Sequence, residues 1–388
     1  MNKPLFYWTF IGQALLSFLL WENRTEGYTV LMKYNTVKQE EIHTDRQPHL
    51  DLLKALSIVC MILCHTVMRL AAHRPGYATE TGYLFGDAVL GCYVGVAHAF
   101  MLSMGIGFVF SKKTTPLYLL KRGICIYILG YLFNIFRFGV YALLDYVVKV
   151  DYSPDLFHAV LFQDIFQFAG LAMMLTALLM KLKFNEMGIL IVGIVLSCIG
   201  SVVPDIQTGN AFWDIVIGNF VTSTNVPSHF TFLNWFIFVA VGMIFGKIIR
   251  QLKDEDLFYK RLLVGSCIIM TVFILTTAKY GMFFLNRLHR YYAVSILEAV
   301  GYLSIDFFLL SLFFFVTRRF ETGRLGACIT MSRNLTQMYL VHWCMLCFLE
   351  YIVCYLLKYI LPYPVIYLTG ICLIAGSYYI LKEWKINI

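Results

Sequence analysis

The stretch LDLLKALSIVCMILCHTVMRL, residues 50–70, has the length and hydrophobicity of a transmembrane helix except at two positions. Lys54 lies in its first turn and His65 in its second half, where an apolar side chain costs less in a bilayer. Eleven residues at about 100° each make three turns plus about 20°, so both side chains lie on one face of the predicted helix. They lie about 16 Å apart along its axis. The segment therefore indicates a membrane helix with polar groups along one face.

The composition of the chain is that of an integral membrane protein. Of its 388 residues, 60% are hydrophobic and only 14% are charged, against about 25% charged in soluble domains. The net charge of +8 comes from Lys and Arg gathered between apolar runs, a pattern that sets membrane topology rather than nucleic-acid binding. The eleven Cys lie mostly inside apolar runs, without the spacing of metal ligands or of a disulfide framework. We therefore expect an all-α protein in the lipid bilayer, with no metal site and no nucleic-acid partner.

Apolar runs of membrane-spanning length set the expected architecture. A transmembrane helix needs about 20 mainly apolar residues, and about ten segments qualify. An eleventh, shorter run at 5–21 is compatible with an interfacial helix, an additional span or an upstream extension, and no small-residue cleavage site follows it. We expect an N-terminal segment, 1–45, and one helical membrane domain, 46–388. The predicted helices cover approximately residues 50–71, 84–110, 118–136, 160–180, 187–204, 229–249, 260–280, 296–316, 334–357 and 363–381.

Lys and Arg in the connections between these runs predict the orientation. Connections rich in cations alternate with poorer ones, such as 205–228. By the positive-inside rule, the start of the first main helix and the C-terminus lie in the cytoplasm. The connection 281–292 falls on the outer side although it contains Arg287 and Arg290, so these cations contact a ligand or the helix count differs by one there. The cation-rich connections are 111–122, 181–183, 247–261 and 318–333.

Several segments, in a shared order, resemble one family of membrane enzymes. Lys54 and His65 are similar to the Lys/Arg, ten residues, His pattern of the membrane acyltransferase superfamily. This superfamily includes acyltransferase family three and the heparan-alpha-glucosaminide N-acetyltransferase-like proteins, and the chain resembles the latter over roughly residues 46–345. Lys54-Ala55 departs from the Arg-Gly that is frequent there. The segments are RQPHLDLLKALSIVCMILCHT (46–66), HAFMLSMGIGFVFSKK (98–113), YLLKRGICIYILGYLFN (118–134), FQDIFQFAGLAMML (162–175), FLNWFIFVAVGMIFGK (232–247) and MSRNLTQMYLVHW (331–343).

The resemblance implies acyl transfer from a cytoplasmic acyl-CoA, most simply acetyl-CoA as co-substrate, to a sugar or glycoconjugate hydroxyl or amino group across the membrane. The histidine of the first helix is the family's expected catalytic residue, here His65. A neutral imidazole suits proton removal from an acceptor that attacks a thioester, while covalent transfer through His65 stays open. Lys54 is expected to bind a CoA phosphate. The alternatives are a helix-end anchor for Lys54 and a buried, helix-bonding role for His65.

Asp164 and Gln167 form a polar pair in the fourth predicted helix. Three residues apart, they lie on one side of that helix. A carboxylate in lipid needs a partner, for which His65, Arg122 and Arg137 qualify. We expect Asp164 to take part in catalysis and Gln167 to bind the acceptor. The alternative is that the pair only joins two helices.

Polar residues of the third and ninth predicted helices are expected to contact the acceptor, and nearby cations are expected to bind CoA. The alternative for the third helix is a solvated helix end, and for the ninth it is hydrogen bonding between helices. The alternative for the cations is that they only set topology. For the isolated Asp306, a functional role and a structural role are equally open. The expected acceptor contacts are Asn134, Arg137, Asn334, Gln337 and His342, and the expected CoA contacts are Lys121, Arg122 and Arg333.

Two other classes of protein compete with the enzyme. The first is a proton-coupled transporter or flippase of a glycan or small solute, with Lys54, His65 and Asp164 along its path. The second is a scaffold subunit whose polar residues only pack helices. No proline interrupts a predicted helix and no inverted repeat is found, which disfavours a transporter. The spacing and the ordered segments favour the acyltransferase, most simply in a bacterial inner membrane, and leave the oligomeric state open.

Overall fold

The computed structural model of the chain describes residues 46–94, 97–111, 114–149, 156–222, 229–286, 290–319 and 325–384. Residues 1–45, which include the apolar run 5–21, lie outside the described residues, as does Arg287. Over the described ranges all regular structure is helical and no strand is present. The predicted all-α fold is confirmed.

The described part of the chain is a succession of helices. Among the described residues, the 3₁₀ helices are η2 (Tyr77–Thr79) and η5 (Tyr291–Ala293), and the π-helices are η3 (Phe85–Tyr93), η4 (Ile135–Gly139) and η7 (Tyr351–Leu356). The α-helices are α3 (Pro48–Ala71), α4 (Thr81–Leu84), α5 (Ala97–Phe110), α6 (Pro116–Asn134), α7 (Val140–Val148), α8 (Leu156–Leu161), α9 (Ile165–Lys181), α10 (Glu186–Val202), α11 (Ala211–Gly218), α12 (Phe232–Arg250), α13 (Glu255–Tyr280), α14 (Ile296–Thr317), α15 (Gly326–Arg333), α16 (Leu335–Glu350) and α17 (Tyr363–Trp384).

Eight helical stretches are long and apolar enough to cross a membrane, counted by length and composition over the part of the chain that the structure describes. Two shorter apolar helices, α9 and α10, lie where two further spans were predicted. The chain is therefore an integral, multi-pass membrane protein, and the predicted number of about ten helices agrees approximately.

Two predicted helices differ in continuity from those observed. The run predicted at 160–180 is divided into α8 and α9 by residues 162–164, which are not helical. The run predicted at 118–136 is longer, because α6 continues through η4 into α7 as one stretch, Pro116–Val148. Both runs are mainly apolar, with Gln163 and Asp164 at the break and Asn134 and Arg137 near the start of the extension, so hydropathy alone does not locate the break or the extension.

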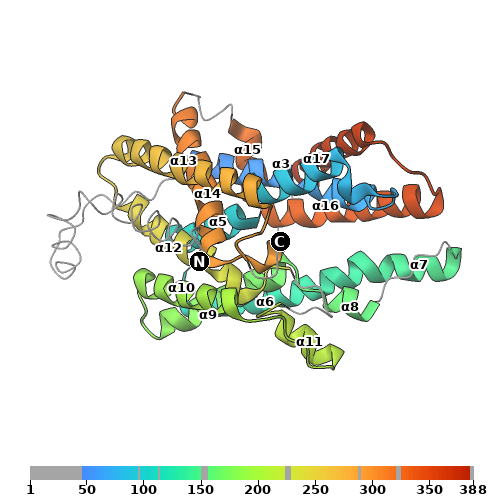
Figure 1. Cartoon of the computed structure of the whole chain (residues 1–388), viewed down its shortest axis with the longest axis horizontal. Coiled ribbons are helices and arrows are strands. Elements are labelled where there is room, and N and C mark those ends of the chain that lie inside the picture. The colour runs from blue at the N-terminus through green and yellow to red at the C-terminus, as the bar shows by residue number, and fades with distance from the viewer. Residues whose placement is uncertain are drawn as a thin grey trace.

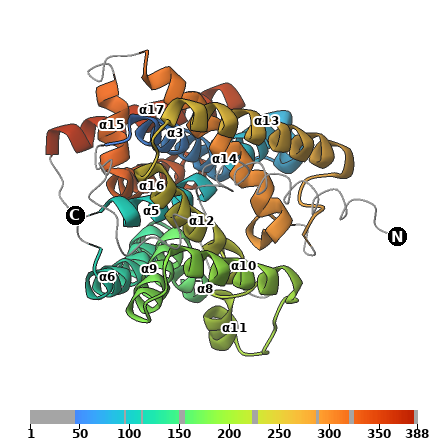
Figure 2. The same ribbon diagram turned by 90° about the vertical axis from the view of Figure 1, so that its left-hand side faces the viewer.

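The helices form two groups with a shared middle layer (Figure 1). Helices α3 and α13–α17 lie in the upper half of the view, α6–α11 lie in the lower half, and α5 and α12 lie between them. The view turned by 90° shows the same division (Figure 2). Helix α3 packs against α14, α15, α16 and α17 in its own group, and α6 packs along α9 in the other. The two helix groups meet beside α3 and α16, where η4 contacts α16.

The middle layer depends on a close contact between α5 and α12. Helix α12 carries fully buried Trp235, Phe236 and Phe238, and it lies along much of α5 and α10. A Cβ atom at Gly105 would overlap the Val239 carbonyl oxygen, and one at Gly242 would overlap that of Leu102. Small residues at facing positions let two membrane helices approach closely. This contact fixes the layer on which both groups rest.

Candidate active site

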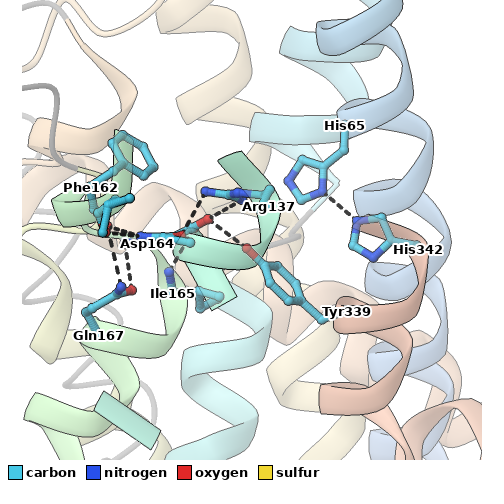
Figure 3. Close-up of polar contacts among 10 residues, drawn as sticks. His65, Arg137, Phe162, Asp164, Ile165, Gln167, Tyr339 and His342 are labelled. Atoms are coloured by element: carbon cyan, nitrogen blue, oxygen red, sulfur yellow. Dashed lines mark hydrogen bonds and ion pairs between the residues drawn. The ribbon is translucent and has the colours of Figure 1, made fainter. Parts of the chain in front are cut away.

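Polar side chains from four separate elements converge where the two helix groups meet (Figure 3). His65 comes from α3, Arg137 from η4, Asp164 from the N-terminus of α9, and Tyr339 and His342 from α16. These elements are far apart in sequence, so the cluster exists only in the folded chain. It lies in the membrane-spanning part of the protein, where ionisable groups mark functional sites by default.

His65 and His342 form a hydrogen-bonded histidine pair. The Nδ1 atom of His65 lies 3.0 Å from Nε2 of His342, and the rings stack with centroids 5.3 Å apart at an interplanar angle of 10°. His65 also packs against the Trp343 ring, at 4.6 Å between centroids. His342 is fully buried, whereas His65 remains partly exposed. The partly accessible imidazole of His65 is therefore hydrogen-bonded to the inaccessible imidazole of His342.

Asp164 caps helix α9 and holds two side chains of the site. Its Oδ1 accepts a hydrogen bond from the backbone N–H of Ile165 at 2.8 Å. Its Oδ2 accepts from Nη1 of Arg137 at 3.1 Å and from the hydroxyl of Tyr339 at 2.7 Å. Gln167 Oε1 accepts from the backbone N–H of Asp164 at 3.0 Å and completes a capping box. Among the three expected partners of Asp164, the structure pairs it with Arg137.

Asn134 and Arg137 are buried, so the alternative of a solvated helix end is wrong for both. The Nη2 atom of Arg137 donates to Asn134 Oδ1 at 3.2 Å, and its guanidinium lies over the Trp343 ring, 4.6 Å from the centroid. Asn134 Nδ2 donates to the carbonyl oxygens of Val160 and Phe162 at 3.1 and 2.7 Å. These bonds satisfy backbone groups at the interruption between α8 and α9, which would otherwise be unpaired at membrane depth.

Gln167 also bonds to the backbone at the interruption between α8 and α9. It is fully buried, and its Nε2 donates to the carbonyl oxygen of Phe162 at 3.4 Å. Both side-chain amides, of Asn134 and Gln167, thus bond to the backbone around residues 160–164. Their contact with an acceptor stays a prediction, and what the structure shows is that they hold Asp164 in place.

The other predicted residues lie apart from this cluster. Lys54 is partly buried on the same uninterrupted helix as His65, which is the arrangement that the spacing predicted. Gln337 is partly exposed on α16, and Asn334 Nδ2 donates to the carbonyl oxygen of Thr330 at 2.9 Å. Within the described ranges, no hydrogen bond joins these residues to His65. The remaining predicted cations are all exposed, namely Lys121, Arg122 and Arg333.

Isolated Asp306, whose role the sequence left open, pairs with His98 in the middle layer. Its Oδ1 lies 2.9 Å from Nδ1 of His98, and both side chains are fully buried. His98 Nε2 lies 3.2 Å from the carbonyl oxygen of Cys92, to which it donates. This pair joins α5 to α14 and is separate from the histidine pair.

Three residues of the site were missed in the sequence. Tyr339 lies three positions before His342 and four before Trp343, and these spacings on α16 put Tyr339 on a shared face with each of them. His229 precedes α12, and its ring stacks on Tyr292 with centroids 3.8 Å apart. Burial lowers the pKa of the His229 imidazole to about 4, opposed by the Asp164 carboxylate and reinforced by Arg137. Nothing in the local sequence distinguishes His229 as a neighbour of Asp164.

The fold and the site define a class of protein: a multi-pass helical membrane protein with a histidine pair and an Arg–Asp pair at membrane depth. Among the described residues, no group of three His, Cys, Asp or Glu is placed to hold a metal ion. An imidazole in such an arrangement is able to accept or donate a proton.

The family model of heparan-alpha-glucosaminide N-acetyltransferase, catalytic, matches residues 46–274, more than half of the chain. The chain therefore belongs to this family, which confirms the resemblance found in the sequence. No curated protein matches it. The membership indicates a membrane acetyltransferase. His65, Arg137 and Asp164 lie within the matched residues, whereas Tyr339 and His342 lie beyond them.

Proposed function

We propose that the chain transfers an acetyl group from acetyl-CoA to a hydroxyl or amino group of a sugar or glycoconjugate, with His65 as the catalytic residue. The observation that carries this proposal is the position of His65. Its imidazole is partly accessible at membrane depth, and a fully buried histidine holds one of its ring nitrogens. The family name refers to an amino group of a glucosamine unit, so amino sugars are the first acceptors to test.

The reaction requires one proton acceptor close to the thioester. The acceptor N–H or O–H attacks the thioester carbonyl, a carbon–nitrogen or carbon–oxygen bond forms, and His65 takes the proton. The tetrahedral intermediate then expels CoA as the carbon–sulfur bond breaks, and the imidazolium of His65 returns the proton to the sulfur. Alternatively, His65 attacks the thioester first and carries the acyl group itself. Both routes give acetylated acceptor and free CoA.

Asp164 and its partners are proposed to shape the acceptor side of the site. The carboxylate is fixed by the helix cap and in turn holds Arg137 and Tyr339. The Nε–H of Arg137 is buried and has no hydrogen-bond partner among the described residues. A buried donor without a partner is costly unless something else satisfies it. We propose that Arg137 meets a polar group of the bound acceptor or of the tetrahedral intermediate.

The donor is proposed to enter from the cytoplasmic end, where α3 begins. Lys54 lies about 16 Å along the helix from His65, a separation similar to the reach of a phosphopantetheine arm. Exposed cations near the same predicted side provide further phosphate contacts, namely Lys121, Arg122 and Arg333. In this proposal the C-terminus lies in the cytoplasm and the acceptor on the far side of the membrane, most simply a bacterial inner membrane, as the positive-inside rule predicts from the sequence.

The test is incubation of the purified full-length protein with labelled acetyl-CoA and a panel of amino sugars and neutral sugars, with mass analysis of the products. Acetylated sugar in the wild type and none with His65→Ala is the expected result. A suitable control is His73→Ala, because His73 lies beyond the end of α3 and bonds Glu350 at 3.1 Å. Full activity in His65→Ala would remove His65 from the mechanism, and no product from any sugar would count against the proposal. Sugar uptake that is indifferent to CoA would favour the transporter.

A further inference from the structure

We infer that His342 is a positioning residue that sets the tautomer of His65, so that Nε2 of His65 is the atom that takes the acceptor's proton. The inference rests on the proposed catalytic role of His65. It assigns to His342 a role different from the predicted contact with the acceptor, and it concerns a helix that lies outside the residues matched by the family model.

The argument begins at a backbone carbonyl. Nδ1 of His342 lies 2.9 Å from the carbonyl oxygen of Met338, one helical turn earlier on α16. A carbonyl oxygen only accepts hydrogen bonds. Nδ1 of His342 is therefore protonated and donates.

The second step is that His342 is neutral. Its side chain is fully buried, and a buried charge needs an opposite charge in contact. The oxygens of Asp164 bond to Ile165, Arg137 and Tyr339. No carboxylate bonds to His342 in the described part of the chain. A neutral imidazole with a proton on Nδ1 has a bare Nε2, which accepts a hydrogen bond.

The third step follows from the contact between the two rings. Nδ1 of His65 lies 3.0 Å from the bare Nε2 of His342, so this nitrogen of His65 must be the donor. In neutral His65, the remaining Nε2 then carries the lone pair. It makes no hydrogen bond to any described residue, and the side chain is partly exposed. The structure thus leaves one ring nitrogen of His65 unprotonated and open to a substrate.

This chain of hydrogen bonds also supports the reaction. When Nε2 of His65 takes a proton, its Nδ1–H continues to donate to His342, and no ring has to turn. The nearly parallel rings and the contact with Trp343 hold the imidazole in one orientation. An orienting partner of this kind fixes the tautomer and orientation of a catalytic histidine, as the carboxylate does in a serine protease. If His65 instead carries the acyl group, the new bond forms at Nε2.

Three variants of α16 separate positioning from packing. His342→Ala removes the acceptor for His65 Nδ1–H, and His342→Gln restores one, because an amide oxygen also accepts. Leu346→Met is the matched control, since it changes a buried side chain one turn away on the same helix and touches no group of the hydrogen-bond chain. We expect His342→Ala to lower kcat about 10²-fold with little change in the KM of acetyl-CoA. His342→Gln should recover part of this loss, and Leu346→Met should stay near the wild type.

The tautomer itself has a readout that does not require activity. In protein labelled with ¹⁵N-histidine, two-bond ¹H–¹⁵N spectra distinguish protonated from bare ring nitrogens, and His65→Gln identifies the His65 signals among the nine histidines. We expect the wild type to carry the proton on Nδ1 of His65 and His342→Ala to show a mixture. A proton on Nε2 in the wild type would overturn the inference, as would wild-type kcat in His342→Ala or equal losses in all three variants. Failure of the proposed function would instead appear as an inactive wild type with the expected tautomer.

Discussion

The pair Arg137–Asp164 provides a quantitative test of how the site is built. The two side chains are 3% and 15% exposed, and Nη1 lies 3.1 Å from Oδ2. Asp164→Asn keeps a capping side chain at the start of α9, since Asn is also a good N-cap, but it leaves the buried guanidinium without its carboxylate. Breaking a buried pair in this way costs about 3–5 kcal/mol.

Removal of the other partner should cost less. In Arg137→Met, the Asp164 carboxylate keeps its bonds to the Tyr339 hydroxyl and to the backbone N–H of Ile165, and it is the more exposed partner. The cost should be about 2 kcal/mol, the size of a hydrogen bond to a charged group. The double variant removes both charges together, so we expect a loss of about 2–3 kcal/mol instead of a sum of about 5–7 kcal/mol.

The free energy of unfolding can be measured by titration with SDS in mild detergent, with tryptophan fluorescence as the signal. The matched control is the cycle Glu186→Gln with Lys247→Met, a pair at 2.7 Å in which both side chains are 30% exposed. Its coupling should stay below about 1 kcal/mol. If the effects at residues 137 and 164 add within about 0.5 kcal/mol, the two charges do not interact and this description of the site is wrong.

Two further predictions concern the donor and the acid side of the pH range. Lys54→Ala should weaken CoA binding, measured as thermal protection of the purified protein, more than it lowers kcat; an unchanged CoA affinity would count against the phosphate role. Burial lowers the pKa of His229 to about 4 from its ordinary value of 6.5. Between these two pH values the unfolded chain binds the proton and the folded chain does not. Stability should therefore fall as the pH drops through this window, and His229→Phe, which keeps a ring against Tyr292, should flatten that part of the curve; equal slopes in both proteins would refute this.

Long apolar helices were predictable from the sequence because local composition determines them. The runs expected at 296–316 and 187–204 are observed as Ile296–Thr317 and Glu186–Val202. In a bilayer, a helix satisfies its own backbone hydrogen bonds, so an apolar run of sufficient length has few other conformations. The spacing of Lys54 and His65 on one helix could be read for the same reason.

The interruption before α9 could not be predicted from local composition. The segment LFQDIFQF (161–168) contains three polar residues, Gln163, Asp164 and Gln167, but polar residues also occur inside other predicted membrane helices. The chain stops being helical at 162–164, where partners elsewhere satisfy its backbone. Asn134 supplies two of these bonds from another helix. The interruption moves Asp164 from the middle of a predicted helix to the cap of an observed one, which is why its carboxylate can face Arg137 and Tyr339.

The histidine pair shows the limit of spacing arguments most directly. The sequence predicted that His65 is catalytic and that His342 contacts the acceptor, but 277 positions separate them and no pattern joins them. The family match ends at residue 274 and so omits the helix that completes the site. Since His342 fixes which nitrogen of His65 is bare, the reactivity of a matched residue depends on an unmatched one. A chain with the matched segment alone would therefore retain His65 but lack the partner that selects its tautomer.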